Sequence, residues 1–280
     1  MTALLALLSA VMVGGADFLG GITSRRARPV VVAATSQVLG LSVAVPIALV
    51  WWADDLHGQD VALSLAGGIA VGVGFVFFYA AMAGGLISLA APVAAVVGAV
   101  LPVAVGFVRG ERPGAAAVMG VVLALVAIAI VSIAPMPSAP GADAAARTVA
   151  LGAAAGFCFG FFFVLFAGID EDAGLAPLPI YRVASAAVLV AVAAAMRIHV
   201  GEARPVARRA LAISTLEVLA TVPLLLALQR GPLVIAAVVA SLYPVTTVIL
   251  ARGLLHERLS RPQLAGVALA LAAVVLVSTG

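Results

Sequence analysis

The chain has 280 residues, of which 65% are hydrophobic and only 10% charged, and its formal net charge is +3. Soluble domains carry about 25% charged residues, so this composition excludes a water-soluble protein. All 15 basic residues are arginines that lie mostly at the ends of apolar segments, as orientation signals do in membrane proteins. The positive charge therefore does not indicate a nucleic-acid partner, and the lipid bilayer is the expected environment.

Ten apolar segments follow one another along the chain. A helix that crosses a bilayer needs about 20 predominantly apolar residues, and charged residues, prolines and glycines separate segments of about that length. The expected spans are 2–22, 31–52, 61–83, 86–107, 114–134, 147–168, 177–196, 209–229, 232–252 and 262–279. The sequence therefore predicts an all-α integral membrane protein with ten transmembrane helices.

The two halves of the chain repeat one another. A shift of 146 residues places 81–134 on 227–280 without a gap, with about 16 of 54 positions identical. Glu111 and the arginine after it fall on Glu257 and its arginine, which composition does not explain. The predicted domains are a first five-helix repeat (1–134), a linker rich in Pro and Ala (135–146) and a second five-helix repeat (147–280).

An odd number of helices in each repeat has a consequence for topology. The second repeat enters the membrane upside down relative to the first, which gives the inverted repeat of many secondary transporters. By fold-level analogy, two such halves enclose a central cavity that opens to one side of the membrane and then to the other. The sequence thus predicts two inverted five-helix repeats around a central cavity.

Short motifs in the second half carry a resemblance to a known family. They are the run Ala227–Leu233 (ALQRGPL), the run Ser241–Val245 (SLYPV), the pair Glu257-Arg258 and Gly266. The chain resembles the ten-helix EamA-type members of the drug/metabolite transporter superfamily. The first half matches less well: Gly98 replaces the proline equivalent to Pro244, and Asp17 stands where the family often has Asn. The resemblance implies a two-repeat basket and export of amino acids, metabolites or drugs.

Two carboxylates inside apolar segments are candidates for proton or substrate coupling. Glu217 lies near the middle of the eighth span, where removal from water disfavours its charged form. A group that takes up either a proton or a cationic substrate is what a proton-coupled exporter needs. The alternative for Glu217 is a neutral side chain that hydrogen-bonds to a neighbouring helix. Asp17, late in the first span, either lines the same cavity or pairs with Arg25 or Arg26 near the membrane surface.

Arg182 is the third candidate. It follows two prolines at the start of the seventh span and is suited to a bidentate contact with a substrate carboxylate. Alternatively, it reaches the headgroups or pairs with an acid of the preceding loop, such as Asp170 or Glu171. Glu111 and Glu257 each precede a helix start, where an acid favours the helix dipole, so we expect a structural role for both.

Aromatic side chains supply candidates for the wall of the cavity. Phe78 and Tyr79 on the third span and Tyr243 on the ninth are the residues we expect there. The five phenylalanines between 157 and 163 cannot all point one way, so most are expected to face lipid or a neighbouring helix. Gly152, Gly156 and Gly160 are spaced four residues apart and predict a strip where another helix approaches closely.

The distribution of arginines and the family resemblance predict opposite orientations in the membrane. Connectors after odd-numbered spans hold eleven arginines and those after even-numbered spans hold three. The positive-inside rule then places both termini outside the cell, whereas the family resemblance places them inside. Either way we expect a multi-pass protein of the cell (inner) membrane.

Other sites have no support in the sequence. His57, His199 and His256 lack the spacing of metal ligands, and no Gly-rich loop precedes a Lys-Ser/Thr pair for ATP. We therefore expect no metal, no cofactor, no enzyme activity and no obligate protein partner. The predicted function is a proton-coupled secondary transporter that exports small metabolites, amino acids or drugs. The alternatives are a passive facilitator, a flippase for lipid-linked substrates, an intramembrane enzyme and a structural subunit.

Overall fold

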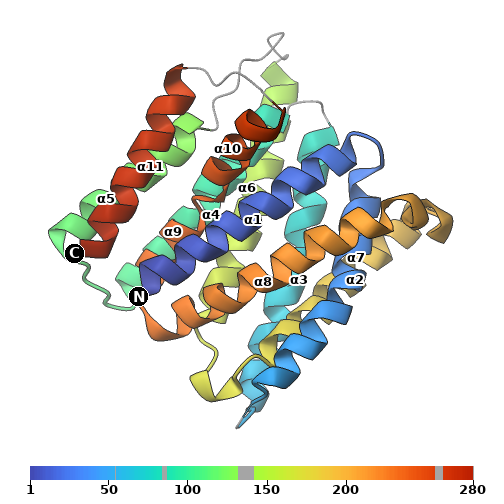
Figure 1. Cartoon of the computed structure of the whole chain (residues 1–280), viewed down its shortest axis with the longest axis horizontal. Helices are drawn as coiled ribbons and strands as arrows, with labels where there is room; N and C mark the ends of the chain where they lie inside the picture. The colour runs from blue at the N-terminus through green and yellow to red at the C-terminus, as the bar shows by residue number, and fades with distance from the viewer. Residues whose placement is uncertain (54, 84–86, 132–141, 256–260, 280) are drawn as a thin grey trace.

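The computed structural model describes residues 1–53, 55–83, 87–131, 142–255 and 261–279. Over these residues the chain forms eleven α-helices and two short 3-10 helices (Figure 1). The α-helices are α1 (Thr2–Ser24), α2 (Pro29–Val50), α3 (Gly58–Ala83), α4 (Ile87–Val108), α5 (Ala115–Val131), α6 (Ala142–Phe166), α7 (Pro177–Ala195), α8 (Ala207–Arg230), α9 (Leu233–Ala240), α10 (Tyr243–Leu255) and α11 (Arg261–Thr279). The 3-10 helices are η1 (Glu171–Ala173) and η2 (Val200–Val206). Each of the ten predicted spans contains a helix, and the ninth contains two.

The helices have the length and surface of membrane spans. In the described part of the chain, six helices are long and apolar enough to cross a bilayer, and four shorter apolar helices accompany them. Large apolar side chains such as Leu4, Val50, Val108 and Leu271 are exposed on the outside of the bundle. In water they would be a liability, but a bilayer covers them with lipid chains. The protein is a multi-pass membrane protein, as predicted.

The connectors gather at two opposite ends of the bundle. At one end, the Leu175 N–H donates to the Trp51 carbonyl at 2.9 Å, and Arg230 pairs with Glu171 at 2.9 Å. At the other end, Arg28 lies 3.9 Å from Glu202, which joins the connector after α1 to the one after α7. Connectors after even-numbered spans thus meet at one end, as they must when successive helices cross a membrane in alternating directions.

The main helix contacts join the two halves of the chain. α1 packs against α8, α9 and α10, and α6 packs against α3 and α4. The repeat makes α1 the counterpart of α6, α3 of α8, and α4 of α9 and α10. Each contact of α1 with the second half therefore has an equivalent contact of α6 with the first half. The pairs α2–α7 and α5–α11 each join a helix to its own counterpart. α5 and α11 lie side by side at the edge of the bundle (Figure 1). This exchange pattern is the one a two-fold repeat requires, while the inverted orientation stays a prediction.

A proline explains why the ninth span is two helices. The carbonyl of Ala240 would accept a hydrogen bond from the residue four positions later, but that residue is Pro244, which has no N–H. α9 accordingly ends at Ala240 and α10 begins at Tyr243. The break leaves the C-terminal end of α9 in the interior of the bundle, where the N–H groups of Ser241 and Leu242 donate to the carbonyls of Ala237 and Val239.

Small residues on α6 allow the close approach that the sequence predicts for its glycine strip. A Cβ atom at Gly160 would lie 2.7 Å from the carbonyl oxygen of Gly98 on α4, and one at Gly156 would collide with the carbonyl of Ala94. Backbone-to-backbone packing therefore fixes α6 against α4.

Glu111 has a structural role, but for a different helix from the expected one. Its two carboxylate oxygens accept the backbone N–H groups of Leu233 at 2.8 Å and Val234 at 3.0 Å. It therefore caps the start of α9, in the other half of the chain, instead of the helix that follows it in sequence. Glu257 lies outside the described residues.

The helix of the sixth span begins earlier than the expected start at residue 147. α6 begins at Ala142, inside the expected linker 135–146. Alanines are the strongest helix formers, and the Ala-rich residues before Arg147 extend the helix backward beyond its apolar segment. The remaining residues of the predicted linker, 135–141, lie outside the described residues.

The α4–α6 contact can be tested by adding one methyl group. We expect Gly160→Ala to lower the free energy of unfolding by about 1–3 kcal/mol, because the methyl group overlaps the Gly98 carbonyl. Gly20→Ala is the matched control: it is also a helical glycine, and a Cβ there meets nothing within 4 Å. Thermal unfolding of both variants in the same detergent measures the difference. Equal midpoints for the two variants would contradict the close contact.

Candidate functional site

A cavity of about 170 Å³ lies in the middle of the bundle, between helices of both halves. Its wall comprises residues of α1, α2, α3, α4, α6, α7, α8 and the region of the α9–α10 break. The lining residues are Ser9, Val13, Asp17, Gln37, Val71, Phe75, Phe78, Ala94, Ala95, Gly98, Phe159, Phe162, Phe163, Tyr181, Arg182, Glu217, Thr221, Leu224, Ala240, Ser241 and Tyr243.

The residues that line this cavity come from equivalent positions in the two halves. Seven pairs of lining residues are separated by the same 146 positions that relate the halves: 13 and 159, 17 and 163, 71 and 217, 75 and 221, 78 and 224, 94 and 240, and 95 and 241. Arg182 also donates to the carbonyl of Ser36, 146 positions earlier, at 3.5 Å. In a two-fold repeat, equivalent residues lie close together only near the pseudo-two-fold axis that relates the halves. The cavity therefore lies across that axis.

Equivalent positions in the two halves differ in chemistry. Asp17, Glu217, Thr221 and Ser241 form what we call the polar wall. Their equivalents, 146 positions away, are Phe163, Val71, Phe75 and Ala95. With Phe78, Phe159 and Phe162, these apolar residues form the aromatic wall. The cavity is therefore polar on one side and aromatic on the other.

Arg182 and Glu217 form an ion pair at the cavity. One carboxylate oxygen of Glu217 accepts from both terminal nitrogens of Arg182, at 3.3 Å and 3.2 Å. The Arg182 side chain is 1% exposed, whereas the Glu217 side chain is 22% exposed. A guanidinium does not release its proton in proteins, so its charge is tolerable at this depth because Glu217 neutralises it.

A chain of hydrogen bonds supports the ion pair. Thr221 donates its hydroxyl hydrogen to the Glu217 carbonyl at 2.8 Å. The hydroxyl of Tyr181, 3.1 Å from Thr221, must then be the donor of that contact. Tyr181 is left to accept from Arg182 at 3.4 Å. The direction of every hydrogen in this network follows, and the network ties α7 to α8.

Several buried polar atoms beside Arg182 have no protein partner. Within the described residues, the Ser36 and Ser185 hydroxyls, the Gln37 side-chain oxygen and the Nε of Arg182 form no hydrogen bond. Such groups are costly unless water supplies the missing bonds. The α2–α7 contact next to the cavity therefore has hydrogen-bonding groups that no described protein atom satisfies.

Asp17 faces the cavity from α1. More than a third of its surface is exposed, and no ion pair or hydrogen bond of its carboxylate is found among the described residues. Of the two alternatives left open by the sequence, the geometry places Asp17 in the cavity instead of beside Arg25 or Arg26. Glu217 and Asp17 thus share one cavity although they are 200 residues apart in sequence.

The remaining predicted residues are placed as follows. Arg182 neither reaches the headgroups nor pairs with the acids of the preceding loop, because the start of α7 is buried in the bundle. Phe78 and Tyr243 line the cavity. Tyr79 does not line it: its ring stacks on Phe75, and it packs against a cluster that includes Leu189.

The phenylalanines of α6 divide between the two faces of the helix. Phe157 and Phe161 are 53% and 41% exposed on the outside, where they stack on one another. Phe159, Phe162 and Phe163 line the cavity. The sequence predicted that these five could not share a face, but it did not show which of them point inward.

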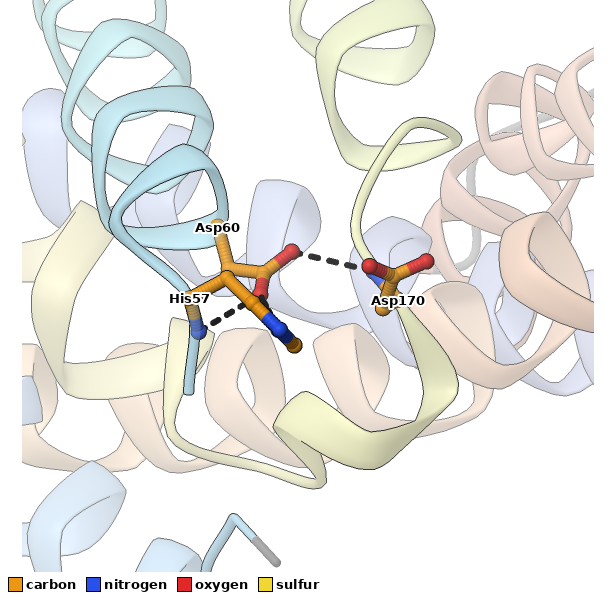
Figure 2. A group of neighbouring side chains, drawn as sticks. All are labelled: His57, Asp60 and Asp170. Carbon is orange, nitrogen blue, oxygen red and sulfur yellow. Dashed lines mark hydrogen bonds and ion pairs between the residues drawn. The ribbon is translucent and has the colours of Figure 1, made fainter. Parts of the chain in front are cut away.

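His57, Asp60 and Asp170 come together at one end of the bundle, although the spacing of the histidines predicted no metal site (Figure 2). The carboxylate oxygens of Asp60 accept the backbone N–H groups of His57 and Asp170, each at 3.1 Å. The first bond caps the start of α3, and the second attaches the connector after α6. These bonds give Asp60, which is 1% exposed, a structural role.

Comparison with known proteins adds a family to this geometry. Residues 146–279 match the model of the EamA-like transporter family. The resemblance predicted from the motifs is thereby confirmed for the second half of the chain. That EamA-like half contributes Arg182, Glu217 and the broken ninth span to the cavity.

Solved structures extend the likeness to the whole chain. A crystal structure described only as that of a protein is similar with a TM-score of 0.78 and 18% sequence identity. The match covers 99% of this chain and 96% of that one, so the fold is shared over both halves. No match was found among curated proteins.

Sequence reasoning missed the polar residues that complete the site. Tyr181 and Thr221 were not among the predicted site residues, although Tyr181 is adjacent to Arg182 and Thr221 follows Glu217 by one helical turn. Residues four apart lie on the same helix face, so the position of Glu217 was a usable indication for Thr221. Ser9, Gln37 and Ser241 have no comparable indication.

The ion pair generates a prediction about stability. We expect Glu217→Leu to lower the free energy of unfolding by about 3–5 kcal/mol, because it leaves the charge of Arg182 buried without a partner. Arg182→Met should be less harmful, because Glu217 is partly exposed to the cavity and can take up a proton. Thermal unfolding of the two single variants and of the double variant measures the coupling. The double variant should be more stable than Glu217→Leu alone; strict additivity would contradict the pairing.

Proposed function

We propose that the protein is a secondary transporter that carries small molecules across the membrane through its central cavity. The observation that carries this proposal is the position of the cavity: it lies across the axis that exchanges the two halves and holds ionisable groups. Charged residues within a membrane bundle are expensive and typically belong to substrate or ion pathways. The match of the second half to a transporter family supports the same conclusion.

We further propose that alternating access follows from the repeat. If the repeats are inverted, exchange of their conformations turns an opening on one side of the membrane into an opening on the other. The helices that would move against one another are those that pair across the halves, such as α1 with α8 and α6 with α3. The cavity between them would then face each side in turn.

Proton coupling is proposed for Glu217 and Asp17. The other titratable or charged groups at the cavity are Arg182, Tyr181 and Tyr243. Two carboxylates that share one cavity repel one another, which favours proton uptake by one of them. A proton on Glu217 would also weaken its hold on Arg182. A protonated carboxylate is neutral and no longer attracts a cation. A proton and a cationic substrate would therefore compete for this site, as antiport requires.

The membrane and the orientation are part of the proposal. A multi-pass carrier of this composition would act in the cell (inner) membrane. The charges of the connectors place the arginine-poor end, which carries Asp170 and Glu171, outside. Fluorescent labelling of a cysteine introduced at either end, in intact cells, would decide between the two orientations.

The proposed coupling predicts proton movement that depends on Glu217. In proteoliposomes with a pH-sensitive dye inside, a panel of amino acids and cationic drugs should include a substrate that causes a pH change. Glu217→Gln should abolish the pH change because the amide cannot carry the proton. Asp143→Asn, which removes an exposed acid at the start of α6, should leave it intact.

Other outcomes of this assay identify the alternatives. Substrate flux that persists in Glu217→Gln without proton movement would make the protein a passive facilitator and Glu217 a structural acid. Absence of flux for every solute, with transfer of a lipid-linked probe between leaflets, would instead indicate a flippase.

A further inference from the structure

We infer that the cavity selects an amphipathic monocation: an amine attached to one small aromatic or apolar body. This inference rests on the proposed function, since it names the substrate class of the same cavity. It concerns binding, however, and can be tested without any transport. Three features support it: the charge count, the position of Arg182 and the aromatic wall.

When both carboxylates are ionised, the charges at the cavity sum to a negative value. Among the described lining residues, Asp17, Arg182 and Glu217 are the only ones with Asp, Glu, Lys or Arg side chains. Arg182 and Glu217 cancel one another at 3.2 Å, so Asp17 supplies the remaining charge. A single positive charge in the ligand would complete the balance, whereas an anion would add a second uncompensated charge.

Arg182 is poorly placed to receive a ligand carboxylate. Its side chain is 1% exposed, and its guanidinium lies against Gly40, where even an added Cβ would collide with it. Its terminal nitrogens already donate to Glu217, Tyr181 and Ser36. A carboxylate would have to displace Glu217 from this position. An amino acid therefore gains little from its carboxylate here.

Asp17 is available on the polar wall, and the ninth span adds to its attraction for a cation. α1, which carries Asp17, packs against both α9 and α10. Ala240, whose carbonyl lacks its helical donor because of Pro244, lines the same cavity. The C-terminal end of a helix carries a partial negative charge, and such ends bind cations in broken transporter helices. Asp17 and the end of α9 together favour an ammonium group.

The aromatic wall fits the apolar part of such a molecule. Phe159 meets Phe75 edge to face, with ring centroids 5.4 Å apart, and lies 6.3 Å from Phe78. These rings offer dispersion contacts to an apolar body and cation–π contacts to a nearby charge. A dry cavity of about 150 Å³ holds benzene, so about 170 Å³ suits one ring with a short chain.

Three probes with the same ring and different charges test the inference. They are 2-phenylethylamine, phenylalanine and 3-phenylpropionate, which are respectively a cation, a zwitterion and an anion at pH 7. Isothermal titration calorimetry on the full chain in detergent should show the amine binding at least about tenfold tighter than phenylalanine. The propionate should not bind at millimolar concentration.

Variants locate the effect at Asp17. Asp17→Asn should weaken binding of the amine by about tenfold or more, while Asp17→Glu keeps the charge and should retain the preference for the amine. Asp143→Asn, outside the cavity, is the matched control and should bind like the wild type. Thermal unfolding of each variant establishes that it is folded, and the three-probe comparison on the wild type needs no variant at all.

Two results would overturn the inference. The first is binding of phenylalanine or 3-phenylpropionate at least as tight as that of the amine, or no binding of the amine at millimolar concentration. The second is amine binding that folded Asp17→Asn retains in full. Failure of the proposed transport is distinct from both: it would appear as intact amine binding in detergent with no flux in proteoliposomes.

Discussion

Close approach of helices from opposite halves of the chain is the constraint on which the rest of the structure depends. Lipid chains are as apolar as leucine side chains, so no hydrophobic force drives these helices together, and packing must hold them. The glycines with the tightest surroundings contact the other half: Gly14 meets α10, Gly68 meets α7, Gly120 meets α11 and Gly160 meets α4. Glu111 crosses the same boundary to cap α9. Each half therefore completes its packing and its hydrogen bonds only through the other, and the repeats form one unit.

The cavity follows from this packing and from one helix break. Helices that pair across the halves separate around the axis, and Pro244 prevents the ninth span from continuing as one helix. The side chains that face the space come from α1, α2, α3, α4, α6, α7, α8 and the α9–α10 break. Arg182 is buried there, and its cost is offset by Glu217 on the neighbouring helix. The same ion pair that lets an arginine lie in the bundle leaves Asp17 as the unbalanced charge.

The sequence predicted the helices well and the contacts poorly, for a physical reason. Spans can be read from local composition, because a bilayer imposes length and apolarity on each helix separately. Glu217 and Asp17 could be singled out in the same local way, as acids in apolar segments. The partner of Arg182 could not: its position near the start of a span suggested the membrane surface, whereas the connector around η1 buries that end of α7. The target of Glu111 was also missed, since it lies 122 residues away in the other half. Both errors concern contacts between separate helices, about which local composition carries no information.

The divergence of equivalent positions gives the repeat its functional meaning. Two identical halves would place the same group on both sides of the axis, so the acid at 217 would be duplicated at 71 and the acid at 17 at 163. Instead, valine and phenylalanine occupy the second copies. The packing that joins the halves is retained in both, because it depends on small residues and on the shape of the helices. The cavity wall is free of that requirement, and it has separated into an acidic side and an aromatic side. A symmetric scaffold thus holds an asymmetric site, and that asymmetry is what orients an amphipathic molecule within it.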